Sequence, residues 1–96
     1  MTDFCITAVR YNTDRKHISY VQVREEKPDS VGSRRTVARA FVADLIRLGK
    51  ASFQTRIKKA DGKFYPGAHI HLIDDTFLST DKNSSERDNL GSLPEF

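Results

Sequence analysis

Basic side chains concentrate in the middle of the chain. Nine Lys and Arg residues and two acidic residues lie between Arg34 and Lys63, which gives this segment a net charge of +7. Residues 1–33 hold five basic and five acidic side chains, and residues 64–96 hold two basic and six acidic ones. A positive field segregated in this way attracts polyanions or an acidic protein face. The sequence therefore predicts a partner that is either nucleic acid or an acidic protein surface.

Five of these cations are the candidate binding residues: Arg35, Arg39 and Arg47 on a predicted helix, and Arg56 and Lys58 on the strand after it. The planar fork of arginine can donate two parallel hydrogen bonds to a phosphate, and such contacts give an affinity that falls steeply with salt. The alternative is an ordinary solvated face, which charged residues cover by default. The sequence leaves open whether the helix and strand residues form one patch.

His69 and His71 are the candidates for a metal site. Alternate residues of a strand point to the same face, so two imidazoles could share one ion, and His17, Asp74 or Asp75 could complete a mixed site. The alternative is a solvent-facing histidine pair, because no third ligand is fixed by spacing. We therefore expect no metal and no cofactor, and a metal-dependent hydrolase acting through His69 and His71 is the rival interpretation.

No arrangement of side chains predicts catalysis. Asp74 and Asp75 are adjacent, so on a strand they would point apart, and neighbouring Asp residues are typical of a turn. The serines have no base at a recognised spacing, and no nucleophile elbow or Gly-rich phosphate loop is present. We expect a binding or regulatory module that is not an enzyme.

The elements that would position these residues follow from hydrophobic periodicity. Alternation predicts strands over 4–11, 17–24, 50–58, 68–73 and 76–80, and a period of 3.6 predicts a helix over 34–48. The fold class is therefore α+β, in the order β-β-α-β-β-β. We expect an antiparallel sheet of about five strands with one helix packed on one face.

The helix has the clearest signals at its ends. Ser33 can serve as N-cap, and Gly49 stands where a left-handed residue commonly follows a helix. We expect the apolar side of the helix to pack on the core. Arg35, Arg39 and Arg47, with Ala40 and Ala43, lie on the opposite side. The expected apolar face consists of Val37, Ala38, Phe41, Val42, Leu45 and Leu48.

A chain of 96 residues makes one domain, 1–96. Residues 81–96 read as a polar loop and an apolar tail, with Leu90, Leu93 and Phe96 folded onto the domain. The alternative is a tail that docks on a partner. Cys5 is the only cysteine and reads as a buried apolar residue.

A single cysteine cannot form an internal disulfide, which fits a reducing cytoplasm. The first residues lack a basic and an apolar region, so we expect no signal peptide. Apolar runs are only two or three residues long, so we expect no membrane span. We therefore expect a cytoplasmic protein. The sequence gives no indication of its oligomeric state.

The C-terminal tail resembles that of a known protein family. Asp88-Asn89-Leu90, two further residues and then Leu93-Pro94-x-Phe96 resemble the ending of a bacterial family of small proteins known only as a domain of unknown function. The opening Ile6-x-x-Val9-Arg10 and the strand Phe77-Leu78-Ser79-Thr80 before the acidic loop are similar too. The resemblance implies a bacterial or phage-borne origin, and it brings no known reaction, ligand or partner.

Overall fold

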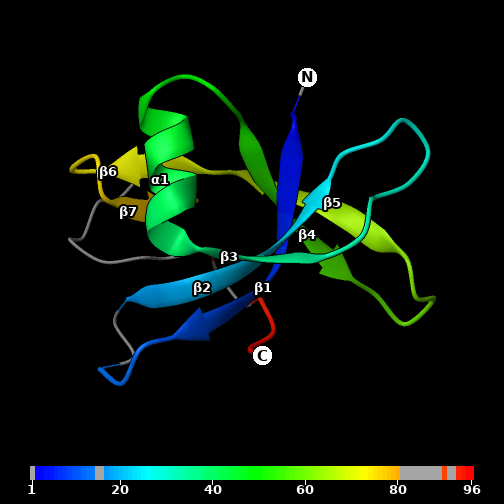
Figure 1. Cartoon of the computed structure of the whole chain (residues 1–96). Helices are drawn as coiled ribbons and strands as arrows, with labels where there is room; N and C mark the ends of the chain where they lie inside the picture. The colour runs from blue at the N-terminus through cyan, green and yellow to red at the C-terminus, as the bar shows by residue number, and fades with distance from the viewer. Residues whose placement is uncertain (1, 15–16, 81–89, 91–92) are drawn as a thin grey trace.

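A computed structural model describes residues 2–14, 17–80, 90 and 93–96. It shows an α+β fold with one helix, as expected, and a mostly antiparallel five-stranded sheet (Figure 1). The expected order β-β-α-β-β-β was wrong, because an additional strand precedes the helix and four strands follow it. A separate two-stranded sheet completes the described elements. In chain order the elements are β1 (Phe4–Tyr11), β2 (Ile18–Glu25), β3 (Arg35–Ala38), α1 (Arg39–Arg47), β4 (Phe53–Lys58), β5 (Phe64–His69), β6 (His71–Ile73) and β7 (Phe77–Ser79).

The large sheet has the strand order β3-β2-β1-β4-β5. Adjacent strands in this sheet are antiparallel, except for β1 and β4. These two strands are parallel, and their register aligns Phe4 with Phe53 and Ile6 with Thr55. The expectation of a wholly antiparallel sheet was therefore wrong. The reason is the crossover: after β3 the chain passes through α1 to the far side of β1, and β4 then runs in the same direction as β1 (Figure 1).

The helix is shorter at its start than predicted. Residues 35–38 form β3, which pairs with Tyr20 to Val23 of β2, because the β-branched pair Thr36 and Val37 suits a strand and the edge of β2 offers it backbone partners. Ser33 is therefore not the N-cap. The N-cap is Ala38, which has no side-chain capping bond.

The end of the helix is as predicted. Gly49 has φ +68°, the left-handed conformation that glycine adopts freely. Its N–H donates to the carbonyl of Ile46, and the N–H of Lys50 donates to the carbonyl of Leu45. These two bonds form a Schellman motif, which satisfies carbonyl groups at the end of the helix.

The buried face of α1 is rotated from the expected one. Val42 and Ala43 are its buried residues, so the placement of Ala43 on the polar side was wrong. Phe41 and Leu48 were expected in the core, but they are 55% and 59% exposed. The short helix packs against β2, β3, β6 and β7, and this position selects a different face (Figure 1).

The strand predicted over 68–73 is two strands in different sheets. They meet at Ile70, which is buried and whose N–H donates to the carbonyl of Phe53. Asp74 and Asp75 form the predicted turn, with φ values of 52° and 55°. The N–H of Thr76 donates to the carbonyl of Ile73 across this turn, as in the tight turns that favour Asp and Asn in hairpins.

The core lies between the large sheet, α1 and the β6–β7 pair, and the end of the tail closes it. Leu90 and Leu93 are buried. The N–H of Val9 donates to the carbonyl of Pro94 at 2.9 Å, and the N–H of Phe96 donates to the carbonyl of Val9 at 3.0 Å. The loop predicted over 81–89 lies outside the described residues. No helix in the described part of the chain is long and apolar enough to cross a membrane.

Candidate anion-binding groove

Two projecting turns frame a groove at one end of the large sheet. The first is the loop 26–33, held by the bonds from the N–H of Lys27 to the Ser30 carbonyl and from the N–H of Gly32 to the Glu25 carbonyl. The second is the turn between β4 and β5, where Gly62 has φ +82°. Both turns lie on the side of the molecule away from α1 (Figure 1). The groove between them encloses about 570 Å³.

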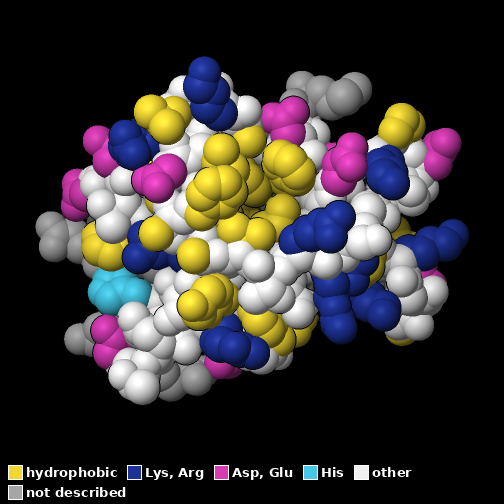
Figure 2. Space-filling model, in the orientation of Figure 1, with side chains coloured by type: hydrophobic (Ala, Val, Ile, Leu, Met, Phe, Trp, Pro, Cys, Tyr) yellow, Lys and Arg dark blue, Asp and Glu magenta, His cyan; other side chains and the backbone are white. Residues whose placement is uncertain are grey.

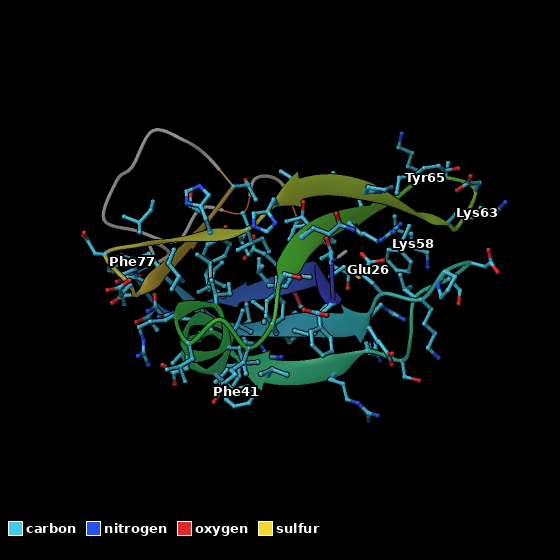
Figure 3. The ribbon with its side chains drawn as sticks, turned by 90° about the horizontal axis from the view of Figure 1, so that it is seen from above. Glu26, Phe41, Lys58, Lys63, Tyr65 and Phe77 are labelled. Carbon is cyan, nitrogen blue, oxygen red and sulfur yellow. The ribbon has the colours of Figure 1, made fainter. Side chains whose placement is uncertain are left out.

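The lining of this groove is strongly basic. We call it the basic groove; its cationic side chains come from β2, the loop 26–33, β4 and the β4–β5 turn. Figure 2 shows Lys and Arg side chains gathered at this end of the molecule. Figure 3 shows Lys58 and Lys63 projecting at the same end as Glu26. The lining residues are Arg24, Lys27, Pro28, Asp29, Ser30, Val31, Arg56, Lys63 and Phe64.

Arg24 reaches the groove because it alternates with buried residues of β2. It pairs with Cys5 in the register of β1 and β2, and its guanidinium lies 4.9 Å from the centre of the Phe64 ring. One terminal nitrogen donates to the carbonyl of Gly32 at 3.0 Å. Its Nε is buried and has no hydrogen-bond partner in the described part of the chain. The hydrogen-bonding capacity of Arg24 is therefore only partly used.

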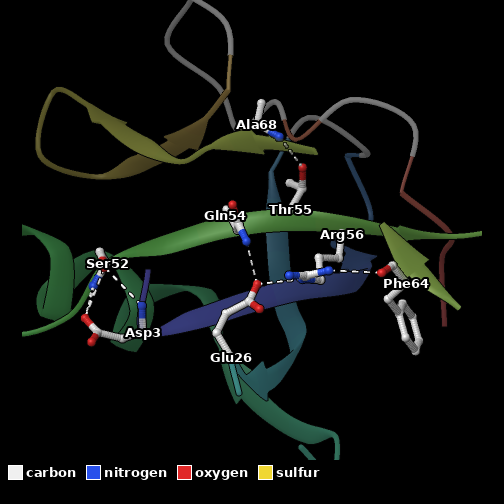
Figure 4. A network of polar contacts seen from close by, with 8 residues as sticks. All are labelled: Asp3, Glu26, Ser52, Gln54, Thr55, Arg56, Phe64 and Ala68. Atoms are coloured by element: carbon white, nitrogen blue, oxygen red, sulfur yellow. Dashed lines mark hydrogen bonds and ion pairs between the residues drawn. The ribbon is translucent and has the colours of Figure 1, made fainter. Parts of the chain in front are cut away.

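Arg56 lies at the base of the groove in a polar network (Figure 4). Its Nε donates to Oε2 of Glu26 at 2.7 Å, and a terminal nitrogen donates to the carbonyl of Phe64 at 3.0 Å. Nε2 of Gln54 donates to the same Oε2 at 2.6 Å. Burial raises the pKa of Glu26, but the bonds from Arg56 and Gln54 outweigh it, so the pKa lies below its ordinary value. Glu26 is therefore ionised at neutral pH.

Cys5 lies beside this network and is fully buried, in agreement with its interpretation as an apolar strand residue. Burial, followed by the charge of Glu26, raises the pKa of its thiol to about 11. A thiol with this pKa carries almost no thiolate at neutral pH and is a poor nucleophile.

The structure separates the five predicted binding residues into groups. Arg56 lines the basic groove, and Lys58 lies beside it with its ammonium 5.9 Å from the centre of the Phe64 ring. Arg35 lies on β3, not on the helix, and lines a smaller hollow of about 210 Å³. Arg39 and Arg47 lie on α1, which is on the opposite side of the molecule from the two turns that frame the groove (Figure 1).

The two helix arginines already have partners within the protein. Arg39 donates to the carbonyls of Ile18 at 3.3 Å and Thr76 at 2.7 Å, which ties the start of α1 to β2 and to the β6–β7 turn. Arg47 forms an ion pair with Asp44 at 3.0 Å. Arg39 thus has a structural role in holding α1.

Of the residues that line the groove, sequence reasoning predicted only Arg56, and it missed the cations Arg24, Lys27 and Lys63 and the aromatic Phe64. Arg24 and Lys27 belong to a segment whose charges balance, so the charge count hid them. A usable signal exists in residues 58–65, where three lysines stand beside two aromatic residues around an Asp-Gly turn. Such interleaving is typical of nucleic-acid-binding surfaces.

The histidine pair spans the junction of two sheets. His69 ends β5 and is exposed, whereas His71 begins β6 and is half-buried. The assumption of one continuous strand carrying both imidazoles was therefore wrong. Across the residues that the structure describes, no group of three or more His, Cys, Asp or Glu side chains is arranged to hold a metal ion.

Comparison with known protein families identifies the family of this chain. A family model described as a protein of unknown function (DUF3892) matches residues 5–94. The expected resemblance to a family of unknown function is thereby confirmed. The chain matches no curated protein and no solved structure at a significant level.

Proposed function

We propose that this chain, which belongs to the DUF3892 family, is a binding module that holds phosphate groups of nucleic acid in the basic groove. The single observation that carries the proposal is the lining of the groove, which has four cationic side chains and one carboxylate, that of Asp29. A hollow lined mainly by one sign of charge focuses the field and raises the local concentration of anions.

Three of the four cations are available to a ligand. Arg24, Lys27 and Lys63 form no ion pair with any residue that the structure describes. Arg56 is paired with Glu26, so its charge is partly neutralised. Because unpaired surface cations gain more from a phosphate than paired ones, binding rests mainly on Arg24, Lys27 and Lys63.

Fluorescence anisotropy of a labelled oligonucleotide at several salt concentrations tests this proposal. We expect binding that weakens as salt rises, because phosphate contacts release counterions. The variant Lys27→Glu plus Lys63→Glu should lower the affinity, and the salt slope should decrease by about one for each lost phosphate contact. Both lysines lie on exposed turns, so the variant should retain the wild-type circular dichroism spectrum.

The matched control is Arg47→Glu plus Lys50→Glu, which changes the net charge equally but at the end of α1. This control should bind like wild type. Equal loss of affinity in both variants would mean that net charge alone drives binding. Loss of affinity in the control alone would mean that the binding site lies on the helix. Either result would reject the basic groove as the binding site.

A further inference from the structure

We propose that the basic groove recognises a terminal phosphate monoester, the doubly charged group found at the end of a nucleic acid strand and on a free nucleotide. This inference rests on the proposed function and narrows its ligand. It depends on three properties of the groove: its size, its charge and its unused hydrogen-bond donors.

The size of the groove suits a small ligand such as the phosphorylated end nucleotide of a strand. A volume of about 570 Å³ falls within the range of sites for small ligands. Its cations come from four separate segments: β2 supplies Arg24, the loop 26–33 supplies Lys27, β4 supplies Arg56 and the β4–β5 turn supplies Lys63. Cations that four segments bring together around one hollow suit a concentrated charge. A chain of phosphodiesters instead needs cations spread along an extended track.

The charge of the groove suits a group with more than one negative charge. The four cations of the lining stand against Asp29, and the neighbouring Lys58 and Glu26 offset each other, so a charge of +3 remains. A phosphate monoester carries about −1.5 to −2 at neutral pH. An internal phosphodiester carries a single negative charge and would offset less of this positive charge than a monoester does.

The donors of the groove also suit a group with several free oxygens. Arg24 donates from one terminal nitrogen to the carbonyl of Gly32, and its other terminal N–H groups bond to no residue in the described part of the chain. Lys27 and Lys63 can each direct up to three N–H donors into the groove. A terminal phosphate offers three strong acceptor oxygens, which allows donors on both walls to be used together.

The direct test compares two oligonucleotides of one sequence, one with a 5′-phosphate and one with a 5′-hydroxyl. We expect the phosphorylated strand to bind roughly 10- to 100-fold more tightly, the factor that hydrogen bonds to a charged group supply. Lys63→Gln should reduce this preference, and Lys50→Gln, at the end of α1, should leave it unchanged. Competition with a nucleoside monophosphate then identifies the source: displacement at equal affinity indicates a free nucleotide, and weaker displacement indicates a strand end.

The outcomes separate this inference from the proposed function. If both oligonucleotides bind equally and Lys63→Gln weakens both, the groove binds internal phosphates and the monoester inference is wrong. If both bind equally and Lys63→Gln changes neither, the inference is wrong and the proposed function fails with it. A preference for the 5′-phosphate that persists in Lys27→Gln plus Lys63→Gln would locate the monoester site outside the groove and overturn the inference.

Discussion

Nε of Arg56 and Oε2 of Glu26 lie 2.7 Å apart at the base of the basic groove. Both side chains are largely buried, with 19% and 9% of their surfaces exposed. The pair joins the loop 26–33 to β4, and thus one wall of the groove to the sheet (Figure 4). It also neutralises Arg56 locally, which leaves the attraction of a ligand to the unpaired cations.

Replacing Glu26 with glutamine should destabilise the protein. The change weakens two short hydrogen bonds and leaves the largely buried Arg56 without this counter-charge. We expect a loss of about 2–3 kcal/mol in the free energy of unfolding, measured by urea denaturation. Asp44→Asn is the control, because it breaks the exposed pair with Arg47 and should cost less than about 1 kcal/mol. Equal losses would show that the buried pair has no special role.

Glu26 should also make stability depend on pH. Its pKa in the folded protein lies below the ordinary value of 4.5, so the unfolded chain takes up a proton first as the pH falls. The stabilisation is therefore complete above the ordinary pKa and is lost as the pH falls through the lower, folded value. Denaturation curves across this range should show a smaller acid-induced loss in Glu26→Gln than in wild type. Parallel pH profiles would contradict the assignment.

The described end of the tail should be part of the folded domain. Leu90 is 3% exposed, so Leu90→Ala should lower the free energy of unfolding by about 2–5 kcal/mol. Leu48→Ala makes the same chemical change at a residue that is 59% exposed and should have a much smaller effect. If Leu90→Ala melts like wild type, the tail contributes little to the core and its role as a docking segment becomes the better hypothesis.

Substitutions at Arg39 and at a lysine of the basic groove should have different effects, one on stability and the other on binding. Arg39→Gln removes donors to the carbonyls of Ile18 and Thr76, so we expect a lower melting temperature and an unchanged affinity for an oligonucleotide. Lys63→Gln should have the opposite effect, with unchanged melting and weaker binding. A folded Arg39→Gln protein that no longer binds would restore α1 as the binding surface.

The sequence predicted those strands, turns and helix ends that depend only on residues close together in the chain. Alternation located β1, β2 and β4, Gly49 marked the end of α1, and Asp74-Asp75 marked a hairpin turn. The start of α1 could not be predicted because residues 35–38 suit either a helix or a strand, and only the open edge of β2 decides between them. The groove could not be predicted because Arg24 and Lys63 are distant in sequence, and the strand order β2-β1-β4-β5 brings them together.

An assigned amide NMR spectrum, titrated with a 5′-phosphorylated oligonucleotide, tests the central claim most directly. The account predicts that chemical-shift changes concentrate in residues 27–31, at Arg24 and Arg56, and in residues 63–64. Residues 39–47 of α1 should change little. Shifts centred on Arg39 and Arg47, or no shifts at a salt concentration low enough for phosphate binding, would contradict the assignment of the basic groove as a nucleic-acid site.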